Sequence, residues 1–317
     1  MISFVSNTRR RRNVVFLPLT ILLSVLLFAS AETTSDKEGR RTAVLFGATG
    51  AVGSEAMRSL LLHNIYHGAP FWEEVVLVGR REAPLFQSDS SLLPNITQII
   101  VEDMTVADQN ERLKSVKADA CIIAVGSSSP MVGTLRTWHD VDVVLPAAVA
   151  RLCRSMGATY ISLLSAVDSE EGGPTPFDEA ELAEGDDTTL GWWGMLVRYA
   201  RVKGLAEQAA SSADISNVRI FQPSNIVTHE TRYGWFDRIL FQILPYINPI
   251  LPEKYRSVPV RLLGMAMAAD AAKKLLDETH ADDAVVTKLT RGDFIDIAGN
   301  WFHEEEKQLK ADVSEEL

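Results

Sequence analysis

Short apolar runs alternate with amphipathic stretches along most of the chain from residue 41 onward. The apolar runs predict strands at 42–46, 74–78, 98–101, 118–125, 159–164 and 217–221. Helical spacing of apolar residues predicts helices after the first strand, over about 134–156 and over about 195–210. Continuous apolar strands separated by helices require right-handed parallel crossovers. The order of elements therefore predicts an α/β fold, a doubly wound parallel Rossmann sheet with helices on both faces.

The hydrophobic pattern changes after Gln222. Residues 233–247 are rich in aromatic and aliphatic side chains, and 262–276 read as an Ala- and Met-rich helix. We expect residues 41–303 to form one domain. Within it, about 224–303 are expected to form a small C-terminal region that covers the substrate crevice.

Two features interrupt the regular order. Pro146 lies inside the predicted helix at 134–156, where a missing N–H and a bulky ring should kink or break it. The acidic stretch SEEGGPTPFDEAELAEGDD, at 169–187, separates a predicted strand from the next helix. It reads as an inserted loop, either a lid over the substrate or a surface decoration.

The first 31 residues have the pattern of a targeting segment. The arginines at 9–12 precede an uncharged apolar run at 14–30, and Ala29 and Ala31 fit signal-peptidase cleavage. The run is close in length to a membrane span, so residues 1–31 are either a cleaved signal peptide or an anchor.

Either form of this segment predicts a lumenal location in the secretory pathway, beginning at the endoplasmic reticulum. Membrane anchorage would run through residues 14–31, and a mitochondrial presequence is the alternative. Residues 32–40 read as a polar linker. The sequon that starts at Asn95 is compatible with a lumenal domain.

Charge and cysteine usage exclude some classes of partner. The net charge of -11 and the pI near 5.1 argue against nucleic acid, which needs clustered Lys and Arg. Cys121 and Cys153 lie in apolar runs without metal-ligand spacing, so we expect buried thiols and no metal site. Residues 304–317 read as a solvated acidic tail.

The motif GATGAVG at 47–53 lies where the first strand ends and a helix begins. This context is typical of a dinucleotide site. Gly47 allows a tight turn, Gly50 a close approach to the pyrophosphate, and Gly53 close packing of helix on strand. The predicted binding residues of this turn are Gly47, Thr49, Gly50, Ala51, Val52 and Gly53.

The cofactor is predicted to be NADP(H) rather than NAD(H). An acidic residue at the end of the second strand would bind the ribose of NAD, but this chain has Arg80 and Arg81 there. Guanidinium groups match a 2′-phosphate, and we expect Arg80 to contribute more than Arg81. Asp103 is expected at the adenine edge, Gly126 near the switch point of the sheet, and Pro223 beneath the nicotinamide.

Three residues are predicted to act where the substrate meets the nicotinamide. Tyr199 and Lys203 share one helix face through the spacing Y-x-x-x-K, and Ser165 ends the preceding strand. Lys203 would hold the nicotinamide ribose and make the phenol of Tyr199 more acidic, so that Tyr199 exchanges a proton with the substrate oxygen. Ser165 would hydrogen-bond that oxygen.

Taken in order, several motifs resemble one family. They are LFGATGAVG, VLVGRR, the Val141-Asp142 pair, YISLLSA, YARVK, FQPSNIV and RSVPVRLLGMAMA. From Arg41 to Gly299 the chain resembles the Tat-interacting-protein oxidoreductases and their fungal mitochondrial relatives, atypical members of the short-chain dehydrogenase superfamily. The resemblance implies an NADP(H)-binding Rossmann fold, with Ser165, Tyr199 and Lys203 at the catalytic positions and Arg80 at the phosphate. It implies no particular substrate.

The chain departs from the family pattern in the insertion before Tyr199, in Pro146 and in its N-terminus. The leading hypothesis is an NADP(H)-dependent oxidoreductase acting on a small carbonyl or alcohol. The alternative is a non-catalytic NADP(H)-binding sensor or assembly protein, because a dinucleotide fold does not prove turnover.

Overall fold

One parallel sheet organises the chain after Arg40. The computed structural model describes residues 41–62, 65–66, 69–85, 93–126, 135–169, 192–228, 247–277 and 284–301. Within these residues the main sheet has seven parallel strands. They are β1 (Thr42–Phe46), β4 (Glu74–Gly79), β5 (Asn95–Ile100), β6 (Ala120–Ile123), β7 (Tyr160–Leu164), β8 (Asn217–Phe221) and β11 (Val285–Leu289).

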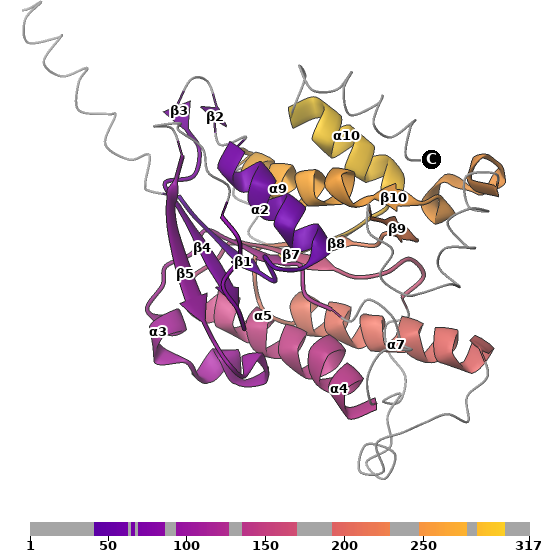
Figure 1. The fold of residues 1–317 in the computed structure, drawn as a ribbon, viewed down its shortest axis with the longest axis horizontal. Helices are drawn as coiled ribbons and strands as arrows, with labels where there is room; N and C mark the ends of the chain where they lie inside the picture. Colours follow the sequence, from indigo (N-terminus) through magenta and orange to yellow (C-terminus); the bar gives the residue numbers. More distant parts are fainter. Residues whose placement is uncertain are drawn as a thin grey trace, which may run out of the picture. The chain divides into compact units, whose positions relative to one another are not determined.

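The strand order is β11-β8-β7-β6-β1-β4-β5 (Figure 1). The chain adds strands on one side of β1 and then, from β6 onward, on the other. Phe46, the last residue of β1, pairs with Val78 of β4 and with Ile123 of β6. Doubly wound sheets bind ligands outside the carboxyl ends of the strands at such a reversal. A ligand site is therefore expected at the carboxyl ends of β1 and β6.

Helices cover both faces of the sheet (Figure 1). One face carries α2 (Ala51–Leu62), α9 (Val260–Leu276) and α10 (Arg291–Trp301). The other carries η1 (Met104–Gln109), α3 (Glu111–Lys114), α4 (Leu135–His139), the π-helical turn η2 (Asp140–Val144), α5 (Leu145–Ser155) and α7 (Trp192–Ser211). Two hydrophobic cores, one on each face, result from this layering.

The first strand shows why the sequence pattern is continuous rather than alternating. Ala43 and Leu45 belong to the core on the α2 and α9 side, whereas Val44 and Phe46 belong to the core on the opposite side. All four side chains are fully buried. A strand covered on both faces needs apolar residues at every position.

Helices α2 and α9 cross at close range. A Cβ on Gly264 would lie 2.5 Å from the Cβ of Glu55 and 2.6 Å from the backbone nitrogen of Ala56. Because any side chain at this position would force the helices apart, Gly264 sets the distance between them.

A buried polar cluster joins α9 to the sheet. The hydroxyl of Tyr160 donates to Asp270 at 2.8 Å, and Arg219 donates to both oxygens of Asp270 at 2.8 and 3.0 Å. Burial raises the pKa of Tyr160 well above its ordinary value, and the Asp270 carboxylate raises it further. The pairing satisfies a carboxylate that would otherwise be costly to bury.

Four short strands form two separate pairs. β2 (Ile65–Tyr66) and β3 (Ala69–Pro70) are antiparallel, whereas β9 (Ile226–Val227) and β10 (Val258–Pro259) are parallel. Two 3-10 turns, η3 (Asn248–Ile250) and η4 (Glu253–Tyr255), precede β10.

The predicted fold class is confirmed, and the predicted strands at 42–46 and 217–221 match β1 and β8. Within the predicted C-terminal region, α9, β11 and α10 belong to the sheet and its helical layer. Residues 229–246 lie outside the described residues. That about 224–303 cover a substrate crevice therefore stays a prediction.

The predicted helix at 134–156 continues through Pro146, but with a π-helical turn directly before it. The Leu145 N–H bonds to the carbonyl of Asp140, five residues back. Pro146 has no N–H for the carbonyl of Asp142, and its ring would crowd that carbonyl in a regular α-helix. The expected distortion is thus found as one widened turn.

Candidate functional site

The glycine turn lies at the switch point between β1 and β6. Gly47 has a φ of +93°, and a Cβ there would lie 2.7 Å from the carbonyl oxygen of Ala124 at the end of β6. A Cβ on Gly53 would overlap the Gly47 carbonyl. The Gly50 N–H closes the turn on Gly47 at 2.9 Å. Only glycine fits the first and last positions, which confirms the close helix packing predicted for Gly53.

Helix α2 begins directly after this turn, at Ala51. Its first amides, those of Ala51, Val52 and Gly53, precede the first intrahelical bonds of the regular turns and can donate to an anion. No acidic residue occupies the first turn. The predicted pyrophosphate residues therefore form a site of the expected polarity.

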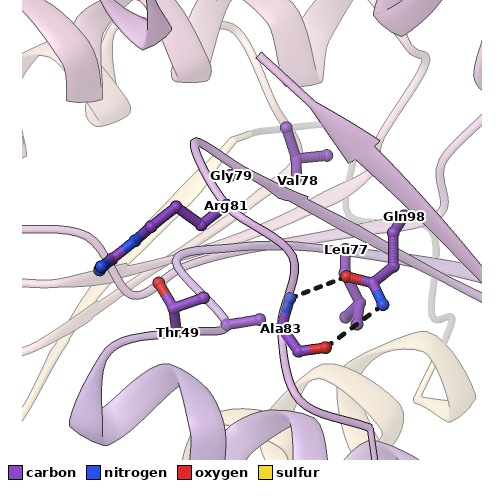
Figure 2. Close-up of a pocket in the computed structure, with 8 residues that line it drawn as sticks. Thr49, Leu77, Val78, Gly79, Arg81, Ala83 and Gln98 are labelled. Atoms are coloured by element: carbon purple, nitrogen blue, oxygen red, sulfur yellow. Dashed lines mark hydrogen bonds between the residues drawn. The ribbon is translucent and has the colours of Figure 1, made fainter. Parts of the chain in front are cut away.

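A small pocket adjoins the glycine turn at the ends of β1 and β4 (Figure 2). Thr49, Gly79, Arg81 and Gln98 are among the residues that line it. Figure 2 shows the Arg81 side chain extended along the side of the pocket where the Thr49 hydroxyl lies. Gln98 holds the chain after β4, accepting from Ala83 N–H at 2.8 Å and donating to its carbonyl at 3.3 Å.

The two predicted arginines differ in position. Arg81 lines the pocket, whereas the lining residues do not include Arg80, and both side chains are exposed. The sequence favoured Arg80 as the main phosphate ligand. In the structure the chain turns after Gly79 and carries Arg81 back toward Thr49, and which of the two arginines binds a 2′-phosphate stays a prediction.

Asp103 is engaged in a helix cap. Its Oδ1 accepts from the Thr105 N–H at 2.9 Å and from the Thr105 hydroxyl at 2.5 Å, and these bonds lower the pKa of Asp103. This is the N-cap of η1. Contact with an adenine edge remains a prediction for this residue.

Lys203 forms a buried ion pair that the sequence did not predict. Its Nζ donates to Asp142 Oδ1 at 2.5 Å, and the two side chains are only 6% and 0% exposed. Burial lowers the pKa of Lys203, but Asp142, Tyr199 and Glu207 together raise it above its ordinary value. The ammonium group therefore remains charged at neutral pH.

Gly126 makes room for this pair at the end of β6. A Cβ there would lie 2.8 Å from Lys203 Nζ and 3.1 Å from Asp142 Oδ1. The sequence predicted that Gly126 lets the backbone approach the cofactor. In the structure its missing side chain is what lets Lys203 reach the switch point.

Tyr199 lies one helical turn before Lys203 on α7 and is partly buried. Its ring stacks on Trp138 with centroids 6.4 Å apart and an interplanar angle of 18°. Lys203 Nζ lies 5.6 Å from the centre of the Tyr199 ring. The predicted Tyr-Lys pair is thus brought together beside α4.

Ser165 is held by a different carboxylate on α7. Its hydroxyl donates to Glu207, a fully buried residue, and Ser165 N–H donates to the Phe221 carbonyl at 2.8 Å. Gln222 Nε2 donates to the same Glu207 oxygen at 2.9 Å, and Lys288 Nζ lies 3.0 Å from the other. A buried carboxylate therefore joins the carboxyl ends of β7, β8 and β11 to α7.

Along the axis of α7, Ser165 lies beside Glu207, whereas Tyr199 lies about two helical turns earlier. Glu207 follows Tyr199 by eight residues, which corresponds to a rise of about 12 Å along α7. The proton of Ser165 is already donated to Glu207. A bond from Ser165 to a substrate oxygen remains a prediction. Donating to that oxygen would require Ser165 to release Glu207, whereas accepting from a substrate hydroxyl would not.

Pro223 lies two residues after the end of β8 and is buried. Its carbonyl accepts from the Val167 N–H at 2.9 Å, so it extends the pairing of β7 and β8 beyond the strand ends. Pro223 therefore lies at the carboxyl edge of the sheet, and its place beneath a nicotinamide stays a prediction.

Two site residues escaped the sequence analysis, Asp142 as a partner of Lys203 and Glu207 as a partner of Ser165. For each of these residues the sequence holds a weak indication of its role. Asp142 lies four residues before a helical proline, and Glu207 continues the four-residue spacing of Tyr199 and Lys203. Such acidic residues are usually solvated, and nothing local reveals that these are buried.

Several predictions concern residues outside those described. They include residues 1–31, 32–40 and 304–317 and most of the insertion at 169–187. Among the described residues, no helix is long and apolar enough to cross a membrane, and no three His, Cys, Asp or Glu side chains are grouped as metal ligands. Cys121 and Cys153 are buried free thiols, which confirms that prediction.

No family model matches the sequence, and no curated protein matches it. Among solved structures, MoeE5 in complex with UDP-glucose and NAD aligns with 82% of this chain and 81% of its own, with a TM-score of 0.49 and 14% identity. A UDP-galactose 4-epimerase aligns over 78% and 77%, with a TM-score of 0.48 and 18% identity. A UDP-N-acetylglucosamine 4-epimerase from Bacillus cereus aligns over 82% and 83%, with a TM-score of 0.47 and 13% identity. These likenesses concern the fold alone, and the resemblance to Tat-interacting-protein oxidoreductases stays a prediction.

Proposed function

We propose that this protein is an NADP(H)-dependent oxidoreductase of the short-chain dehydrogenase type, which transfers a hydride between the cofactor and a carbonyl or alcohol substrate. The observation that carries the proposal is the meeting of two motifs at the end of β6. The glycine turn packs on Ala124, and Lys203 fills the space beside Gly126, two residues further on. The dinucleotide turn and the Tyr-Lys pair therefore lie beside each other at the end of β6.

The residues at this edge of the sheet fit a nicotinamide dinucleotide. The amides at the start of α2 suit the pyrophosphate, the Lys203 ammonium suits ribose hydroxyls, and Thr49 with Arg81 suits a 2′-phosphate. When bound, the cofactor would supply or accept the hydride.

Tyr199 exchanges the proton with the substrate oxygen in the proposed reaction. Stacking on Trp138 restricts its ring, and Lys203 lies one turn away on the same helix face. The substrate contact predicted for Ser165 is secondary, since its hydroxyl donates to Glu207. In the alcohol direction Ser165 would meet a substrate hydroxyl as a hydrogen-bond acceptor.

The cofactor assignment is tested by equilibrium binding of NADPH and NADH to the full chain. Arg81→Gln removes one charge-assisted contact to the 2′-phosphate and should weaken NADPH binding by about tenfold to a hundredfold, with NADH unchanged. Arg80→Gln is the matched control and should change little. An equal loss for both cofactors, or a larger loss from Arg80→Gln, would argue against the assignment.

The reaction assignment is tested with NADPH and a panel of aldehydes and ketones. Tyr199→Phe keeps the ring and its stacking but removes the exchanging hydroxyl, so turnover should fall by at least about a hundredfold. NADPH affinity should stay within about twofold, because the phenol is not assigned to cofactor binding. Turnover that survives this substitution refutes the role of Tyr199.

One observation favours a non-catalytic NADP(H) sensor as second candidate. Lys203 and Ser165 both have carboxylate partners within the protein, Asp142 and Glu207. If Ser165 stays bound to Glu207 and Tyr199 exchanges no proton, the site would bind NADP(H) without reacting. Tight NADPH binding without turnover across the carbonyl panel would support this candidate over the oxidoreductase.

The N-terminal pattern supports a secretory location, with residues 1–31 as signal peptide or membrane anchor. Asn95 of the sequon is exposed at the start of the edge strand β5, where a glycan would meet solvent. Sequencing the N-terminus of protein from eukaryotic cells separates cleavage from anchorage. A mass shift on glycosidase treatment that Asn95→Gln abolishes would support lumenal exposure, and a mitochondrial fraction without the shift would contradict it.

A further inference from the structure

The cation beside Tyr199 is compensated by a carboxylate. Lys203 Nζ lies 5.6 Å from the Tyr199 ring centre, and the same atom lies 2.5 Å from Asp142 Oδ1. The pair is almost completely excluded from solvent, so water screens neither charge well. Gly126 and the widened turn at 140–144 provide the space and the position for Asp142.

The remaining charges near this pair are matched in the same way. Glu207, the next acidic residue on this face of α7, pairs with Lys288. On α4 and its continuation, Asp140 pairs with Arg136 and with the His139 ring. Arg198 and Arg201 project from other faces of α7, about 100° and 200° around the helix from Tyr199. Lys203 is the cation whose contact with the Tyr199 ring the structure shows.

We propose that Asp142 sets the acidity of the Tyr199 phenol by neutralising the charge of Lys203. The Asp142-Lys203 pair, here called the neutral clamp, then carries no net positive charge that would make the phenol more acidic. This inference rests on the proposed function for its catalytic meaning. In a Tyr-Lys site with an uncompensated ammonium group, the phenol loses its proton at a lower pH. Such a site therefore works at a lower pH. With Asp142 in place, proton exchange at Tyr199 shifts toward alkaline pH. Asp142 is therefore a positioning residue that also tunes the proton donor.

A cycle of near-isosteric variants isolates the charge effect. Asp142→Asn removes the carboxylate that neutralises Lys203, Lys203→Met removes the cation of the pair, and the double variant removes both charges and is neutral like the wild-type pair. A unit charge at 5.6 Å and an effective dielectric constant near 20 corresponds to about two pH units. The Tyr199 titration midpoint should rise by about one to two units in Lys203→Met and fall in Asp142→Asn. In the double variant it should lie within about half a unit of the wild type.

The readout is the pH titration of tyrosine 13Cζ resonances in the full chain, without cofactor. Tyr199→Phe assigns the Tyr199 resonance, and circular dichroism defines the pH range over which each variant stays folded. A midpoint in Asp142→Asn no lower than in the wild type overturns the proposal. A double variant whose Tyr199 titration midpoint equals that of Lys203→Met also overturns the proposal. If the single variants fail to fold, the neutral double variant still tests the proposal against the wild type.

This experiment separates two kinds of failure. NADPH binding and carbonyl turnover test the oxidoreductase, whereas the titration tests the charge relation among Asp142, Lys203 and Tyr199 without any cofactor or substrate. If the protein turns out to bind NADPH without turnover, the titration still supports or overturns the neutral clamp.

Discussion

Replacing Gly126 with alanine tests whether space at the end of β6 holds the Lys203 pair in place. The added Cβ would lie 2.8 Å from Lys203 Nζ, whereas ordinary contacts begin near 3.4 Å. The ammonium must therefore retreat by about 0.6 Å, the difference between these distances, and Asp142 Oδ1 at 3.1 Å must also give way. The movement separates a buried ion pair that now spans 2.5 Å.

The expected cost combines overpacking with loss of pairing. Overfilled sites typically lose about 1–3 kcal/mol, and a buried pair that loses one partner completely costs about 3–5 kcal/mol. Because the pair is displaced and not removed, we expect Gly126→Ala to lower the free energy of unfolding by about 2 kcal/mol. NADPH affinity should also fall, by about tenfold or more, because Lys203 is assigned to the ribose.

Urea denaturation followed by circular dichroism measures the stability, and fluorescence titration measures NADPH binding. Gly292→Ala is the matched control, because a Cβ on Gly292 in α10 meets its nearest atoms, those of Glu253, at an ordinary 3.6 to 3.8 Å. Alanine inside a helix should there be neutral or stabilise by up to about 1 kcal/mol. If Gly126→Ala matches the control in stability and binds NADPH like the wild type, the close packing around Lys203 has no energetic importance.

Three further predictions concern charge pairs. Glu207→Gln removes the charge that Lys288 matches while keeping the side-chain shape, so chemical denaturation should show a loss of about 1–3 kcal/mol; an unchanged midpoint would contradict the network. Arg219→Met leaves the Asp270 carboxylate buried without its cation and should cost about 3–5 kcal/mol. NADPH affinity should not change, since Arg219 lies on the opposite face from α7. Asp168 has its pKa lowered by the hydrogen bond from Lys254, so its contribution is present above about pH 4 and lost as pH falls through the folded value. Asp168→Asn should therefore lower stability by at most about 1 kcal/mol at pH 7 and not at all near pH 2.

Local patterns were sufficient for most of the fold. β1 and β8 were predicted with their observed ends. β1 is covered on both faces and is apolar from Ala43 to Phe46, whereas β8 includes Arg219, whose side chain bonds to Asp270. β11 was missed. It is an edge strand whose Val285 and Val286 are 45% and 43% exposed, so neither a continuous nor an alternating pattern marks it.

The site was predictable where it depends on spacing along one element. The glycine turn and the Tyr199-Lys203 pair are local, and a helix or turn fixes their geometry. The partners of these residues are not local. Asp142 is 61 residues from Lys203, and Glu207 is 42 residues from Ser165. Which surface acid becomes a buried partner depends on how helices pack on the sheet, and that information is absent from any single segment.

Two ion pairs fix the position of α7 along its own axis relative to the sheet. Lys203 is held at the end of β6 by Asp142, and Glu207 is held at the ends of β7 and β11 by Ser165 and Lys288. Tyr199 is the next residue in the same four-residue series, about 6 Å further along a rigid helix. With two members of the series fixed, only the rotamer of Tyr199 remains free, and its stacking on Trp138 restricts that rotamer. The placement of the Tyr199 phenol thus depends on carboxylates that need not touch a substrate. Loss of either carboxylate should shift the position of Tyr199, and loss of Asp142 should in addition lower its titration midpoint.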